Sequence, residues 1–192
     1  MEKLEKAFAL FDQYNQQDPN QLEWDGKTYA EEYFFALKLN EWVIQLQPEA
    51  SEELLLASRS QHIGRWKIAR SAYPMDRIGN LTWRSDLAKF HAKTAGELML
   101  EAGYDQALIE RAQKIIQKKQ LKLDPEVQTI ENALCLVFLQ YQLDDFMKKH
   151  DEEKLIRILQ KSWSKMDQAG RDAALTLAYS PDATALLGKA LS

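Results

Sequence analysis

Three polar side chains interrupt the apolar stripes of predicted helices, and their residue types suit chemistry. Glu32, His91 and Glu131 each share a helical face with apolar residues that lie mostly three, four or seven positions away. A buried carboxylate or imidazole is costly unless it is paired or binds a metal, so we expect these side chains to face one another. His62, at the end of another predicted helix, brings the set to two imidazoles and two carboxylates.

Two interpretations of this set stay open. In the first, Glu32, His62, His91 and Glu131 hold a divalent metal such as Mn, Fe or Zn, with water completing the shell. His62, His91 and Glu131 would then be catalytic and would polarise the metal-bound water. In the second, all four are hydrogen-bonded core residues, and His91 and Glu131 form a structural pair.

Basic residues gather between positions 59 and 84. This stretch holds six basic residues and one acidic residue, whereas the whole chain has a net charge of −4. Guanidinium groups flanked by aromatic rings suit phosphate or carboxylate ligands, nucleotides included. The alternative is that the arginines pair with neighbouring acidic helices. The residues expected to bind a ligand phosphate are Arg65, Arg70, Arg77 and Arg84, with Trp66 and Tyr73 as an aromatic wall.

The elements that position these residues are predicted to be helices. Seven Gly and five Pro leave room for few tight turns, and apolar residues recur at steps of three and four along most of the chain. We predict one all-α domain over residues 1–192, with no sheet larger than a stray bridge. The expected helices cover about residues 4–11, 29–47, 51–62, 83–102, 105–119, 125–148, 151–166 and 170–190, the last split near Pro181.

Residues 68–80 form the longest irregular stretch, which is typical of a functional or mobile loop. The single Cys135 lies in the apolar run ALCLVFL and is expected to be a core residue, so nothing indicates an oxidising compartment. The sequence shows no signal peptide and no apolar run of about eighteen residues. We therefore expect a cytoplasmic protein without a membrane partner.

The stretch SQHIGRW, residues 60–66, resembles two known motifs. Its His-Ile-Gly is similar to the His-Ile-Gly-His signature of class I aminoacyl-tRNA synthetases, which follows a buried strand. Here a predicted helix precedes the motif, and the later SKMDQAG lacks the second lysine of the synthetase loop. The stretch also resembles the His-Asp-Ile-Gly of the HD-domain metal-dependent phosphohydrolases, which are all-helical, and this context fits.

The HD-like resemblance runs from about residue 28 to 150. In this alignment Gln61 stands at the signature histidine and His62 at the signature aspartate. EEYFFALKLNEW resembles the first HD helix, FHAKTAGELMLEAGYD a middle one, and VQTIENALCLVFL the late helix with the last acidic ligand. The resemblance implies that Glu32, His91 and Glu131 occupy ligand positions, and that a helical extension over residues 151–192 packs on the core.

A narrower resemblance covers nearly the whole chain. The segments RSQHIGRWKIARSAYPMDRIGNLTWR, QTIENALCLVFL and HDEEKLIRILQKSW are similar to a family known only as a domain of unknown function. Some of its members carry a glutamyl-tRNA synthetase label, which we attribute to a motif such as HIG. Asn132 departs from the acidic residue expected after Glu131 in this group, which favours Glu131 as the ligand.

These observations predict a small HD-like protein that binds a phosphorylated or nucleotide-like small molecule and hydrolyses it with a metal-bound water. The competing prediction is a non-catalytic binding or adaptor protein on a decayed HD scaffold. A third is contact with RNA or tRNA through the arginine-rich segment. Duplex DNA is not expected as a partner, because the overall charge is acidic and no recognition motif is present.

Overall fold

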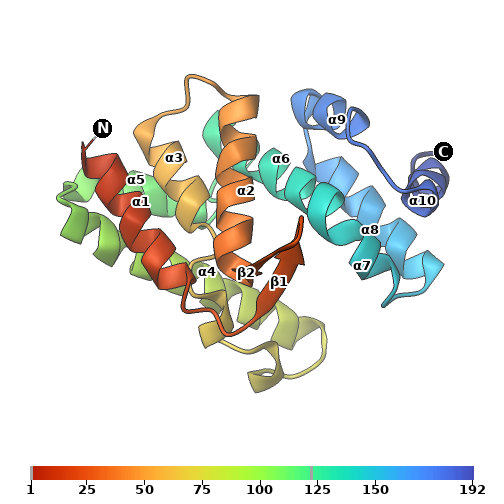
Figure 1. Ribbon diagram of the computed structural model, residues 1–192, viewed down its shortest axis with the longest axis horizontal. Coiled ribbons are helices and arrows are strands. Elements are labelled where there is room, and N and C mark those ends of the chain that lie inside the picture. Colours follow the sequence, from red (N-terminus) through yellow and green to blue (C-terminus); the bar gives the residue numbers. More distant parts are fainter. Residues whose placement is uncertain (1, 122) are drawn as a thin grey trace.

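Helices make up most of the chain, as its periodicity predicts (Figure 1). The computed structural model describes residues 2–121 and 123–192. The predicted all-α class is confirmed. The α-helices are α1 (Glu2–Asn15), α2 (Glu31–Leu46), α3 (Glu52–Ser60), α4 (Arg77–Ala102), α5 (Gln106–Ile116), α6 (Pro125–Val137), α7 (Leu143–Met147), α8 (Glu152–Lys165), α9 (Gln168–Leu175) and α10 (Pro181–Leu191).

Short polar side chains determine where most of these helices begin. The Asp76 carboxylate accepts a hydrogen bond from the Gly79 backbone N–H at 2.7 Å and starts α4 several residues before the predicted position 83. A cap of this kind stabilises a helix by about 1 kcal/mol. Other helices are capped in the same way by Ser51, Asp105, Asp124, Asp151, Asp167 and Ser180.

Two predicted segments are subdivided in the structure. The helix predicted over residues 125–148 is interrupted by a π-helical turn, η3 (Phe138–Gln142), between α6 and α7. The irregular stretch contains the 3₁₀ turns η1 (Arg65–Lys67) and η2 (Arg70–Ala72). The predicted break near Pro181 is found between α9 and α10.

A small hairpin contradicts the prediction that no sheet exceeds a stray bridge. Strand β1 (Gln21–Trp24) pairs antiparallel with β2 (Lys27–Ala30), so Tyr29, which we assigned to a helix, lies in a strand. The connecting residues Asp25 and Gly26 have φ values of 51° and 71°. Positive φ at both positions characterises the tight turn that Asp-Gly favours in two-residue hairpins. The dipeptide signal was therefore present in the sequence.

One continuous cluster of buried apolar side chains runs from Ala7 on α1 to Ala190 on α10. Helix α2 packs against α3 and α6, and α4 packs against α1 and α5. The C-terminal helices α8 to α10 pack on α6 and α7, at the opposite end of the molecule from α1 and α5 (Figure 1). Within the residues described, no helix is both long and apolar enough to span a bilayer.

Candidate functional site

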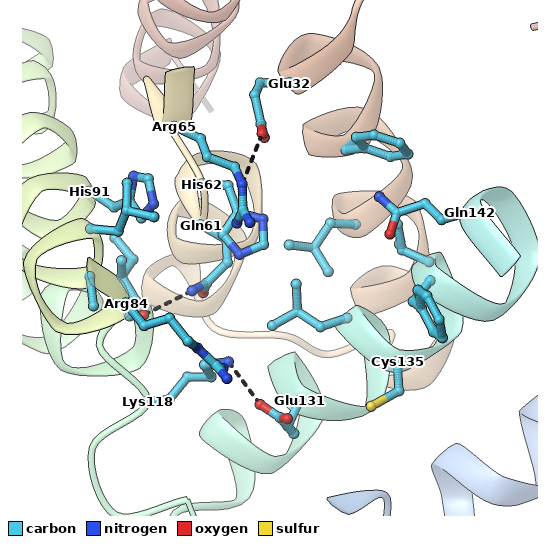
Figure 2. A pocket seen from close by; sticks show the side chains of 18 of the residues that line it. Glu32, Gln61, His62, Arg65, Arg84, His91, Lys118, Glu131, Cys135 and Gln142 are labelled. Atoms are coloured by element: carbon cyan, nitrogen blue, oxygen red, sulfur yellow. Dashed lines mark hydrogen bonds and ion pairs between the residues drawn. The ribbon is translucent and has the colours of Figure 1, made fainter. Parts of the chain in front are cut away.

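A cavity of about 650 Å³ brings together side chains from distant parts of the sequence. Helices α2, α4, α6 and α8 contribute to its wall, together with the residues that follow α3 and α5. In the view of Figure 2, Glu32 and Arg65 lie at one end, His62 near the middle, and Lys118 and Glu131 at the other end. The predicted site residues that line the cavity are Glu32, His62, Arg65, Arg84, His91 and Glu131.

Glu32 lies in the first turn of α2 and is only 8% exposed. Its backbone N–H donates a hydrogen bond to Asp18 Oδ2 at 3.0 Å, which fixes this end of the helix. The Arg65 guanidinium lies 3.7 Å from Glu32 Oε1 and compensates the buried charge only in part. Burial raises the pKa of Glu32 to about 8, against the lowering effect of Arg65. The carboxyl is therefore mostly protonated at pH 7.

His62 and His91 lie next to each other, with ring centroids 5.7 Å apart. His91 Nδ1 is 2.7 Å from the Ile63 carbonyl oxygen. Since a carbonyl can only accept, the neutral ring carries its proton on Nδ1 and leaves Nε2 as an acceptor. Burial lowers the pKa of His91 to about 4 and that of His62 well below its ordinary value, with Arg65 adding to both effects. Both imidazoles are neutral at pH 7.

Gly64 explains the backbone of the HIG stretch. Its φ of 67° is in the left-handed region, where the chain turns out of the end of α3 toward the arginine-rich segment. A Cβ at this position would lie 2.8 Å from the Tyr14 ring and 2.9 Å from the Phe90 ring. Glycine is therefore required by the turn and by the packing around it.

Glu131 lies on α6 and is 2% exposed. Its two carboxylate oxygens pair with two lysines: Lys118 Nζ is 3.0 Å from Oε2, and Lys165 Nζ is 3.0 Å from Oε1. Burial alone would raise the pKa of Glu131, but the two ammonium groups outweigh it and hold the pKa below its ordinary value. Neither lysine was among the site residues predicted from the sequence, although both line the cavity.

The four predicted metal ligands line one cavity, but among the described residues they do not form a compact ligand cluster. Both Glu131 oxygens face lysine ammonium groups, and Glu32 faces Arg65. Among residues 2–121 and 123–192, no three His, Cys, Asp or Glu side chains gather closely enough to hold an ion. Asn132 acts elsewhere: its Nδ2 donates to Asp167 Oδ1 at 2.8 Å.

The arginine-rich segment divides into two groups. Arg65 and Arg84 line the cavity, and Arg84 makes no hydrogen bond or ion pair within the described part of the chain. Arg70 lies outside the lining and donates to the backbone oxygens of Tyr73, at 3.0 Å, and Asp76, at 3.4 Å. Arg77, exposed at the start of α4, also lies outside.

The aromatic residue that the arginine-rich segment contributes to the cavity is Trp83 rather than the predicted Trp66 or Tyr73. Its Nε1 donates to the Ile68 carbonyl at 2.9 Å, and the Arg65 guanidinium lies over its ring at 5.3 Å from the centroid. Trp66 instead packs against Tyr14, with ring centroids 5.9 Å apart. The Tyr73 hydroxyl donates to Asp86 Oδ2 at 3.0 Å.

Helices α2 and α6 and the turn η3 supply most of the apolar lining of the cavity. Phe35 and Leu39 of α2 and Leu134 of α6 contribute to it, and Phe138 and Gln142 come from the π-helical turn η3. Such turns occur frequently at functional sites.

Gln61 adds a polar group to the cavity. Its Nε2 donates to the Ile116 carbonyl at 2.8 Å, while its buried Oε1 has no donor among the residues described.

The fold and the cavity thus define an all-α protein with a charged internal site. Residues 5–187 match the family model described as "Domain of unknown function (DUF4202)". The chain belongs to this family. Comparison with curated proteins and with solved structures finds no match in either set.

Proposed function

We propose that the cavity binds a phosphorylated, nucleotide-like small molecule. The observation that carries this proposal is an excess of positive charge in a partly open cavity. Among the residues that the structure describes, four basic and three acidic side chains line the cavity, and one of the acids, Glu32, is mostly protonated at pH 7. About two positive charges are then left without a counter-charge, and the Arg84 guanidinium is available to a ligand.

The other walls support the nucleotide-like part of the proposal. A volume of about 650 Å³ falls within the usual range of ligand pockets. The apolar wall around Phe35 and Phe138 suits a flat, weakly polar group such as a base. Gln61 Oε1 is a buried acceptor that a ligand hydroxyl or amino group can satisfy.

The test is calorimetric binding to a panel of nucleotides and sugar phosphates, with wild type, Arg84→Ala and Arg77→Ala. Each variant removes one guanidinium from the same segment, but only Arg84 lines the cavity. A charge-assisted hydrogen bond contributes roughly 1.5 to 3 kcal/mol, so Arg84→Ala should weaken binding at least tenfold. Arg77→Ala should leave it within about twofold. Equal effects of the two variants, or no binding to wild type, would refute the proposal.

Hydrolysis of the bound ester is a second candidate, favoured by one observation. A protonated carboxyl and two neutral imidazoles line the same cavity, so a proton donor and a proton acceptor are both present at pH 7. In this scheme His62 takes a proton from the attacking water, and Glu32 gives one to the leaving oxygen of the ester. The products are the free alcohol and phosphate.

Product analysis by phosphorus NMR would test hydrolysis, both in the presence of a chelator and after addition of Mn²⁺, Fe²⁺ or Zn²⁺. The resemblance to metal-dependent phosphohydrolases stays a prediction, and turnover that requires an added metal would support it. Binding of panel members without turnover under any of these conditions would favour a non-catalytic binding protein.

A further inference from the structure

The Glu131 carboxylate holds two lysines that approach it from different parts of the fold. Lys118 follows the end of α5, and Lys165 is the last residue of α8. Each ammonium lies 3.0 Å from a different oxygen of the same carboxylate, so the two ammonium groups lie close together. All three residues line the cavity. The arrangement is therefore a cluster with one negative and two positive charges.

The cluster keeps hydrogen-bonding capacity for a ligand. An ammonium group has three N–H donors, and an ion pair with one carboxylate oxygen engages at most one of them. The side chains of Lys118 and Lys165 are 27% and 44% exposed, whereas that of Glu131 is 3% exposed. A ligand in the cavity can thus reach the lysines but hardly the carboxylate. Glu131 serves as a buried counter-charge that fixes the positions of the two ammonium groups.

The backbone at Lys118 is a second, independent observation. Its φ of 52° lies in the left-handed region, which costs a residue with a side chain roughly 1 to 2 kcal/mol. The Lys118 N–H closes the end of α5 by donating to the Ile115 carbonyl at 2.8 Å, a position that glycine usually occupies. Residues of this kind are enriched at functional sites, but Asp25 and Gln120 share the conformation outside the cavity lining, so the position of the Lys118 side chain carries the argument. Glycine would adopt this backbone conformation without strain, but it would not provide the ammonium group that pairs with Glu131.

We infer that Lys118 and Lys165, held by Glu131, are the phosphate-binding pair of the cavity and take the place of a divalent metal. The two ammonium groups carry the same total charge as such an ion, and they occupy the carboxylate oxygens that a metal would need. The inference rests on the proposed function, because it names the groups that bind the ligand's phosphate. Its consequence is that phosphate binding needs no metal.

The experiment measures binding of inorganic phosphate and of AMP to the full chain by calorimetry, after chelator treatment and again with added Mn²⁺ or Zn²⁺. Lys118→Gln and Lys165→Gln should each weaken binding about tenfold. The controls Lys119→Gln and Lys161→Gln remove exposed lysines close by in sequence and should change it less than twofold. Urea unfolding of every variant shows whether it is folded.

Glu131→Gln separates the ammonium pair from a metal site. If the lysines bind phosphate directly, this variant still binds phosphate in the presence of chelator, because both ammonium donors remain, but more weakly than wild type, because the counter-charge that positions them is lost. If Glu131 is a metal ligand, phosphate binds only with added metal and Glu131→Gln abolishes binding, which overturns the inference. If Arg84→Ala weakens phosphate binding but neither lysine variant does, the proposed function stands and only the inference about the lysine pair is overturned. Absence of binding to wild type overturns it together with the proposed function.

Discussion

The Glu32 carboxyl makes the folded protein less stable as the pH rises. Its pKa is about 8 in the folded protein and 4.5 ordinarily, so the folded state holds a proton that the unfolded chain releases. The contribution is most favourable below pH 4.5 and is lost as the pH rises through 8. At about 1.4 kcal/mol for each pH unit, the loss is roughly 3 kcal/mol at pH 7 and roughly 5 kcal/mol above pH 8.

Glu32→Gln removes this pH dependence and keeps the shape of the protonated side chain. The variant and wild type should have similar free energies of unfolding at pH 4. The variant should then be more stable by about 3 kcal/mol at pH 7, and the difference should level off near pH 8. Urea unfolding between pH 4 and 9 measures it. Glu41→Gln, which removes an exposed carboxylate from the same helix, is the control.

If the difference in free energy of unfolding between Glu32→Gln and wild type does not change with pH, the pKa of the Glu32 carboxyl is not raised by folding and the group is ionised at pH 7. A variant that becomes less stable than wild type as the pH rises would mean that the pair with Arg65 outweighs burial. Either result would also remove Glu32 as a proton donor and reduce the excess positive charge of the cavity by one.

Three further outcomes are expected. The pKa of His91 falls from 6.5 to about 4 on folding, so its contribution to stability is present above pH 6.5 and is lost as the pH falls through 4. His91→Asn should therefore reduce the acid-induced loss of stability by about 3 kcal/mol. Urea unfolding at pH 4 and pH 7 measures this loss. A loss equal to that of wild type would show that burial does not lower the pKa of His91. Gly64→Ala should lower the free energy of unfolding by about 2 to 4 kcal/mol, through its positive φ and the contact with the Phe90 ring, and an effect under 1 kcal/mol would mean that the turn relaxes easily. A phosphate in the cavity should raise the pKa of His62, which NMR titration with and without inorganic phosphate would detect; a pKa unchanged under saturating phosphate would place the anion away from His62.

Local sequence patterns predicted the helices and the inward orientation of three site residues. Glu32, His91 and Glu131 interrupt apolar stripes, and all three are buried in the structure. Such a pattern reports which face of a helix is buried, and this needs no knowledge of the partner helix. The hairpin was missed because the apolar spacing that starts at Tyr29 was assigned to a helix and the Asp-Gly turn that precedes it was not considered.

The partners of these buried groups could not be predicted in the same way. Lys118 and Lys165 lie near helix ends, where a lysine is usually solvated, and nothing in the local sequence shows that both approach Glu131. The arginines of the arginine-rich segment were expected to bind the same phosphate together. The two 3₁₀ turns of this segment instead fold Arg70 back on backbone carbonyls, while α4 carries Arg84 to the cavity.

The cations of the cavity come from segments that are far apart along the chain, from Arg65 near the end of α3 to Lys165 at the end of α8. A ligand held by them would act as a non-covalent cross-link between the two halves of the chain. Ligands that bind only the folded state stabilise it by mass action, and this one would protect distant helices together. Local opening at the end of α8 would then be suppressed by contacts made at α4, and unfolding with ligand bound would be more cooperative than without it.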